Sequence, residues 1–185
     1  MKKKIAILAV LAILVASVAV GSLAYYTHED TVINTITSGG VTIRLVEQTL
    51  QGDALVDFPA GGISGVMPGS SVSKIVTVEN QGSQAWVRIL VETAVTDGEG
   101  GELPADVMSF DIGADWHLGA DGYYYYTLPV AQGESTQPLF EHVTFSTDMG
   151  NEYQNCTVNI TVSAQAVQTA NNGAAYQDAQ GWPEA

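Results

Sequence analysis

Three histidines are the first residues to consider for chemistry, because an imidazole can bind zinc or move a proton near neutral pH. They are His28, His117 and His142. A zinc protease of the common helical type needs two histidines one turn apart, with a glutamate beside the first. No pair of these histidines has that spacing. We therefore interpret the dipeptides His28-Glu29 and Glu141-His142 as isolated polar groups on the surface.

Other catalytic signatures are also missing from the sequence. The stretch Gly62-Ile63-Ser64-Gly65 lacks the Gly-x-Ser-x-Gly spacing of a serine hydrolase elbow. The sequence contains no phosphate-binding loop and no dinucleotide fingerprint. We expect a protein that is not an enzyme, with no catalytic residue, no cofactor and no metal site. A metal-dependent hydrolase is the least favoured alternative.

Acidic side chains leave calcium binding open. They are Asp97, Glu99 and Glu102 in one glycine-rich segment, followed by Asp111, Asp115 and Asp121. Calcium takes several oxygen ligands, which carboxylates on adjacent loops can supply. The EF-hand pattern is absent, however, and acidic turns are ordinary surface features. An acidic surface is the favoured interpretation of these residues.

A run of four tyrosines, Tyr123 to Tyr126, could stack against sugar rings. In a β-strand, alternate side chains point to opposite faces, so one pair packs in the core and the other forms at most half a platform. We favour core and cross-strand packing. The alternative is a cell-surface module that binds polysaccharide or a host ligand through exposed tyrosines.

The elements that position these residues are predicted to be strands, because apolar residues alternate with polar ones along most of the chain. The clearest strand is 156–166, in which Cys156, Val158, Ile160 and every second residue after them share a face. Shorter alternating runs cover 41–45, 72–79, 85–93 and 139–145. In the run 85–93, Val87, Ile89 and Val91 are expected to point inward, and Arg88 and Glu92 outward.

Turn residues divide these runs. Asn80-Gln81-Gly82-Ser83 predicts a hairpin between its flanking strands, and Gly119-Ala120-Asp121-Gly122 predicts a second one. The segments 47–67 and 97–104 are rich in glycine and aspartate and are expected to be surface loops. Asn172 to Trp182 is a helix candidate that Asn172 caps and Gly181 ends. We predict an all-β, antiparallel, jelly-roll-like β-sandwich with a short C-terminal helix, preceded by an N-terminal signal helix.

The first 24 residues have the pattern of an export signal. Three lysines precede the apolar run 5–20, and small Ser22 and Ala24 occupy the positions that a signal peptidase accepts. We expect cleavage between Ala24 and Tyr25, which leaves residues 25–185 as one domain. The alternative is an uncleaved anchor, and only through that segment is contact with the membrane expected.

Removal of this segment makes the chain strongly acidic. Residues 25–185 keep three basic residues, Arg44, Lys74 and Arg88, against all 20 acidic residues, which gives a formal charge of −17. Such a surface repels nucleic acid and anionic lipid, so neither is expected as a partner. Cys156 is the single cysteine, so no intramolecular disulfide can form, and its alternating context predicts a small buried apolar residue.

Several segments resemble the TasA/camelysin family of exported proteins. The export region GSLAYYTHEDTVINTITSGGVTIRLVE is similar to that of the family, in which aromatic residues follow the cleavage point as Tyr25 and Tyr26 do here. PGSSVSKIVTVENQGSQAWVRILVE resembles its central strands, and DWHLGADGYYYYTLPVAQGESTQPLF and AVQTANNGAAYQDAQGW resemble its later segments.

The resemblance implies a jelly-roll domain, export by a specialised signal peptidase, and a role in the extracellular matrix or envelope. Some relatives polymerise when the N-terminal strand of one subunit completes the sandwich of the next. Some members are classed as metallopeptidases, but this sequence has no motif for that activity, and we do not extend it to this chain.

A candidate donor strand follows the predicted cleavage point, and it is β-prone and uncharged. It consists of Thr31, Val32, Ile33, Asn34, Thr35, Ile36 and Thr37. Such a segment can pair with a sheet edge in its own subunit, as an ordinary first strand, or in a neighbour. We expect a secreted structural protein of a bacterial cell surface or biofilm matrix, in which exchange of this strand between subunits would form fibres. Its expected partners are copies of itself, related matrix subunits and, during export, signal peptidase.

Overall fold

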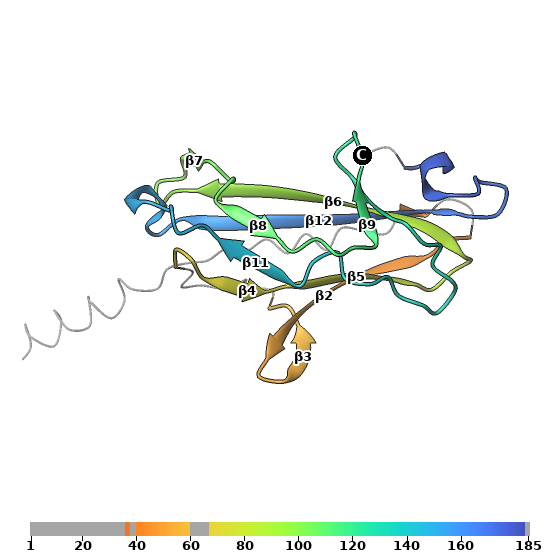
Figure 1. Cartoon of the computed structure of the whole chain (residues 1–185), viewed down its shortest axis with the longest axis horizontal. Coiled ribbons are helices and arrows are strands. Elements are labelled where there is room, and N and C mark those ends of the chain that lie inside the picture. The colour runs from red at the N-terminus through yellow and green to blue at the C-terminus, as the bar shows by residue number, and fades with distance from the viewer. Residues whose placement is uncertain (1–35, 38–39, 60–66, 184–185) are drawn as a thin grey trace, which may run out of the picture.

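The computed structural model describes residues 36–37, 40–59 and 67–183, and this part of the chain is all-β with antiparallel sheets (Figure 1). Its strands, in chain order, are β1 (Ile36–Thr37), β2 (Ile43–Gln51), β3 (Ala54–Asp57), β4 (Ser71–Ser73), β5 (Ile75–Asn80), β6 (Ala85–Thr96), β7 (Glu102–Leu103), β8 (Met108–Phe110), β9 (Trp116–Leu118), β10 (Tyr124–Tyr126), β11 (His142–Phe145) and β12 (Thr157–Gln168). Two 3₁₀ turns, η1 (Asn151–Tyr153) and η2 (Tyr176–Asp178), complete the elements.

Within the described residues, no helix is long and apolar enough to cross a membrane. The predicted signal helix, its cleavage point at Ala24 and Tyr25, and donor residues 31–35 lie outside the described residues.

Two layers of strands face one another. The first is a sheet in the order β1-β12-β6-β10-β9, with β7 beside the end of β6. The second joins two smaller sheets, β3-β2-β5 and β4-β11-β8. The two smaller sheets meet where the N–H of Lys74 donates to the carbonyl of Glu141 and the N–H of Val76 donates to the carbonyl of Phe140. In Figure 1, β6 and β12 run along the upper side and β5, β4 and β2 along the lower side.

The core lies between these layers and confirms the predicted alternation. Along β12, Val162, Ala164 and Ala166 are buried, and Val158 and Ile160 pack against the same cluster. The second layer contributes residues of the same kind, among them Val41, Ile43, Val76, Val78, Leu139, Phe140 and Val143. Burial of these aliphatic and aromatic side chains is the main source of the stability of such a sandwich.

The turn at residues 80–83 corrects a prediction. Its flanking strands do not form a hairpin, because β5 belongs to the second layer and β6 to the first. The turn therefore crosses between layers. Asn80 holds it, since its amide donates to the carbonyls of Ser83 and Val130 and its Oδ1 accepts from the N–H of Gly82. A Cβ on Gly82 would lie 2.4 Å from the backbone nitrogen of Thr42, so only glycine fits there.

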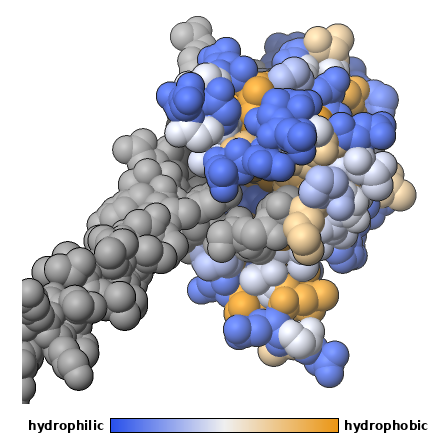
Figure 2. All heavy atoms as spheres, turned by 90° about the vertical axis from the view of Figure 1, so that its left-hand side faces the viewer, coloured by the Kyte–Doolittle hydropathy of each residue, from blue (hydrophilic) through white to orange (hydrophobic). Residues whose placement is uncertain are grey.

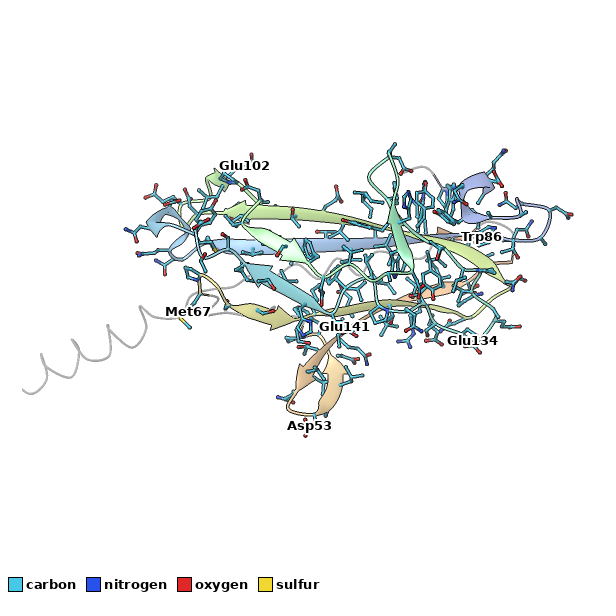
Figure 3. The ribbon with its side chains drawn as sticks, viewed as in Figure 1. Asp53, Met67, Trp86, Glu102, Glu134 and Glu141 are labelled. Atoms are coloured by element: carbon cyan, nitrogen blue, oxygen red, sulfur yellow. The ribbon has the colours of Figure 1, made fainter. Side chains whose placement is uncertain are left out.

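Of two further predictions, the hairpin at 119–122 is confirmed and the loop that begins at residue 47 is wrong. Residues 116–126 form the expected antiparallel hairpin, with Tyr126 opposite Trp116. The first part of the predicted loop 47–67 is not a loop, because β2 extends to Gln51 and pairs with β3. This hairpin projects from the body with Asp53 at its tip (Figure 3), and Leu50 and Leu55 are exposed on it. Figure 2 shows apolar surface at this lower end of the molecule.

The C-terminal segment does not form the predicted helix. It contains only the 3₁₀ turn η2. The reason lies in Asn172, whose side chain does not cap a helix but closes a loop, with Nδ2 donating to the carbonyl of Gln180 and Oδ1 accepting its N–H. Gly173, at φ +75°, adopts a conformation that a helix start does not use.

We predict that Asn80→Ala lowers the free energy of unfolding by about 3 kcal/mol, because the three hydrogen bonds of a fully buried side chain are lost, one of them to the carbonyl of buried Val130. Urea-induced unfolding measures this change. Asn151→Ala, the same substitution on the exposed turn η1, is the control, and we expect it to change stability by less than about 0.5 kcal/mol. Equal effects of both substitutions would contradict the role given to Asn80.

Candidate functional site

The outer edge of β12 is the first candidate site. The inner edge of this strand pairs with β6 over all twelve residues, from Thr157 opposite Thr96 to Gln168 opposite Ala85. Its sequence, TVNITVSAQAVQ, contains no charged residue. Edge strands usually carry charges, prolines or bulges that discourage pairing with another chain. This edge carries neither charge nor proline.

The described part of the candidate donor strand already lies on this edge. Ile36 and Thr37 form β1, which runs parallel to β12 with Ile36 opposite Gln165 and Thr37 opposite Ala166. Among the residues that the structure describes, no other strand pairs with the outer edge of β12. The ladder that the described residues form on the outer edge is thus two residues long, against twelve on the inner edge.

Residues 40–42, between β1 and β2, are anchored by backbone hydrogen bonds. The N–H groups of Gln81 and Gly82 both donate to the carbonyl of Thr42, and the N–H of Ser83 donates to that of Gly40. The turn at 80–83 therefore holds residues 40–42 at the entrance to β2.

A second candidate site surrounds Arg88, on the opposite face of β6 from the core. Its guanidinium donates twice to Oε1 of Gln165, at 2.9 and 2.7 Å, and once to Asp121, at 3.1 Å. It lies 3.9 Å from the ring centroid of Tyr123 and 4.6 Å from that of Trp182. The predicted outward direction of Arg88 is confirmed, but its burial on that face was not predicted. Arg88 leaves the core face as expected, but aromatic side chains bury it to 8% exposure.

The tyrosine run divides as its alternation predicts. Tyr126 is buried in the core and Tyr124 packs against it, whereas Tyr123 and Tyr125 lie on the other face beside Arg88. The sequence did not predict that Trp182 contacts Arg88, because Trp182 lies in a C-terminal segment that was expected to be helical. One signal was present: Arg88 is one of three cations after residue 24, and such a residue needs a partner once buried.

Asp121 completes the Arg88 cluster and has a lowered pKa. Burial alone raises the pKa of this carboxyl, but hydrogen bonds from the Tyr125 hydroxyl and the Tyr123 N–H, together with the charge of Arg88, outweigh it. The same environment raises the pKa of the Tyr125 hydroxyl, first through burial and then through its hydrogen bond to Asp121. The carboxylate is thus held in its ionised form beside the guanidinium.

The carboxylates considered for calcium do not converge as one site. Oδ1 of Asp97 accepts the N–H groups of Glu99 and Gly101, so it closes its own loop. Asp111 instead meets Glu141 and His142, and among the described residues this is the one group of three potential ligands whose ligand atoms lie within 4.8 Å of one another.

Hydrogen bonds within the chain already engage Asp111. Its Oδ1 accepts the N–H groups of Glu141 and His142, and its Oδ2 lies 2.9 Å from Nδ1 of His142. Burial tends to raise the pKa of Asp111, but these hydrogen bonds lower it overall. All three side chains are exposed. Their contacts connect Asp111, which follows β8, to the start of β11, and this structural role explains the arrangement.

An ion pair between a buried lysine and a partly buried glutamate lies in the second layer. The ammonium of Lys74 is 2.8 Å from Oε1 of Glu47 and 3.9 Å from the ring centroid of Phe58. Lys74 is 4% exposed, and Val76 and Val78, two and four residues further along, are fully buried. The pair holds the base of the projecting hairpin against the body.

Cys156 behaves as its alternating context predicts. It is partly buried and packs against the core cluster. Burial raises the pKa of its thiol, so the unreactive protonated form is favoured.

No known protein-family profile matches the chain, and no curated protein sequence matches it significantly. The likeness to TasA/camelysin proteins thus depends on the segments quoted above.

We predict that Asp121 contributes stability that is lost in acid. Because its folded pKa lies below the unfolded value of about 3.9, the contribution is complete above about pH 5 and disappears as the pH falls through the folded pKa. The stability difference between the natural protein and Asp121→Asn should therefore shrink from pH 5 toward pH 3 in urea unfolding. Asp53→Asn, which removes one charge from the exposed hairpin tip, is the control. A difference that stays constant with pH would contradict the pairing with Arg88.

Proposed function

We propose that the chain is a secreted structural protein of a bacterial cell surface or biofilm matrix, and that it assembles through the edge of β12. In this proposal the sandwich is of the jelly-roll type and the leader is removed after Ala24. Its partners are copies of itself or related matrix subunits, and it has no catalytic role. The export pattern and the segments that resemble TasA/camelysin proteins support the location.

The observation that carries the proposal is the outer edge of β12. This edge is long and uncharged, and the described residues pair with it only through β1. The same backbone groups can accept an identical segment from another subunit, so exchange replaces each hydrogen bond with an equivalent one. Exchange thus has a small energetic cost.

The distribution of charge also supports the outer edge of β12 as the contact between subunits. Bodies with a formal charge of −17 repel one another, and contact is least costly where no charge is placed. The candidate donor segment 31–37 and β12 are both uncharged. Salt screens the remaining repulsion, with a Debye length of about 8 Å at physiological ionic strength. Assembly should therefore increase with salt concentration.

The anchor at residues 40–42 supports exchange of the segment that precedes it. Because backbone hydrogen bonds tie Gly40 and Thr42 to the turn at 80–83, β2 stays in its own sandwich. Only residues before Gly40 need to change partners. Donation by the N-terminal segment therefore leaves the core of each subunit intact.

We predict that purified protein starting at Tyr25 forms filaments visible by electron microscopy, more readily at 0.5 M than at about 0.05 M salt. A form starting at Gly39 should remain monomeric, because it lacks the donor segment. Ile36→Pro in the longer form should also reduce assembly strongly, since proline removes a backbone N–H from the strand.

The matched control is Asn151→Pro, which places a proline on η1, outside the first sheet. It should assemble like the natural protein. If the Tyr25 form stays monomeric at high concentration across pH and salt, or if the Gly39 form assembles equally well, assembly through this strand is wrong.

A further inference from the structure

The C-terminal segment and the β9–β10 hairpin enclose an aromatic hollow that the assembly proposal does not use. Its volume is about 380 Å³, and its lining includes His117, Asp121, Tyr125, Tyr176, Gln177 and Trp182. It lies beside β9 and β10, whereas β1 and β12 are at the other edge of the sheet. The two sites can therefore act independently.

Four rings surround the hollow at angles to one another. The centroid of Tyr125 is 6.0 Å from that of Tyr176 and 5.6 Å from that of Trp182, and His117 lies 6.1 Å from Tyr176. None of these pairs is a face-to-face stack, since the interplanar angles range from 34° to 84°. The rings thus form walls of differing orientation around the space.

Backbone and side-chain contacts hold this arrangement in place. A Cβ on Gly119 would lie 2.6 Å from Oδ1 of Asp121 and 2.7 Å from Cε2 of Tyr125, so the turn is packed directly against both residues. On the other wall, the indole N–H of Trp182 donates to the carbonyl of Ala179. Trp86, beneath this segment (Figure 3), donates to the carbonyl of Asn172. The hollow is therefore held from both the hairpin and the C-terminal segment.

The charges around the hollow select the class of ligand. Arg88 already lies against Tyr123 and Trp182, so the cation position over these two rings is filled from within the protein. Asp121 in the lining and the acidic surface disfavour an anion. Aromatic rings together with a carboxylate, an imidazole and an amide in the lining suit a neutral ligand that has apolar faces and many hydroxyl groups.

We propose that this hollow binds one or two rings of a neutral, β-linked polysaccharide. The axial C–H faces of such pyranose rings pack on Tyr125, Tyr176 or Trp182, and their hydroxyls exchange hydrogen bonds with Asp121, His117 and Gln177. A pocket of a few hundred Å³ is large enough for this. Cell-surface material of this chemistry would be held at the opposite edge of the sheet from the strand contact.

The fluorescence of Trp182 provides the test. The other two tryptophans, Trp86 and Trp116, are 5% and 6% exposed, so a ligand in solution reaches Trp182 alone among the three. The purified full chain, in a detergent without a sugar headgroup, is titrated with cellohexaose and with the hexamer of N-acetylglucosamine. Charged hexamers of galacturonic acid and of glucosamine serve as the comparison.

We expect a saturable change with at least one neutral hexamer, and a roughly tenfold or greater loss of affinity in Tyr176→Ala. Tyr176→Leu, which keeps the apolar bulk but not the ring, should lose affinity too. Tyr153→Ala is the matched control, because Tyr153 occupies the other 3₁₀ turn, η1, and should retain binding within about twofold. Circular dichroism checks that each variant is folded.

Three results would overturn the proposal. They are no saturable change with either neutral hexamer up to about 10 mM, unchanged affinity in both Tyr176 variants, or a response to the charged hexamers alone. None of these results affects the filament test, which reads a different edge of the sheet.

Discussion

The register of β12 against β6 is the constraint on which the rest of the molecule depends. In this ladder Val162 lies opposite Val91 and Ala164 opposite Ile89, which directs both strands' apolar side chains into the core. The next pair, Gln165 and Arg88, then necessarily lies on the other face. A shift of one residue would place Arg88 in the core and the valines in water, so the register is strongly specified.

The same ladder supports both candidate sites. Gln165 accepts two hydrogen bonds from Arg88, and Arg88 holds Tyr123, Trp182 and Asp121 on the outer face of the sheet. One residue further along β12, Ala166 lies opposite Thr37 on the outer edge. The central pair of strands thus presents an aromatic group on one face, and an outer edge to which the described residues pair only at Ile36 and Thr37.

Scarce positive charge explains much of the remaining architecture. All three basic residues after residue 24 are ion-paired: Arg44 with Glu79, Lys74 with Glu47, and Arg88 with Asp121. Two of these cations are buried and also contact aromatic rings, which lowers the cost of removing them from water. The outer surface is left with a large excess of carboxylates, and close contact between copies is favoured only at neutral segments.

Sequence alone predicted the elements whose signal is local. The alternation in 156–166 and the hairpin at 119–122 both follow from residue type and spacing. The turn at Asn80 could not be assigned in this way, because the same residues close a hairpin or carry the chain between layers, and the choice depends on which sheet each strand joins. Trp182 lies 94 residues from Arg88 along the chain, and no local pattern relates two residues so far apart.

The short connection between β1 and β2 has a mechanical consequence. Five residues, 38–42, separate the end of β1 from the start of β2, and fully extended they span at most about 18 Å. If β1 belongs to a neighbouring sandwich, this short connection limits how far apart two successive bodies can lie. Contact between neighbouring bodies would then restrict the bending of such a polymer and make the fibre stiff.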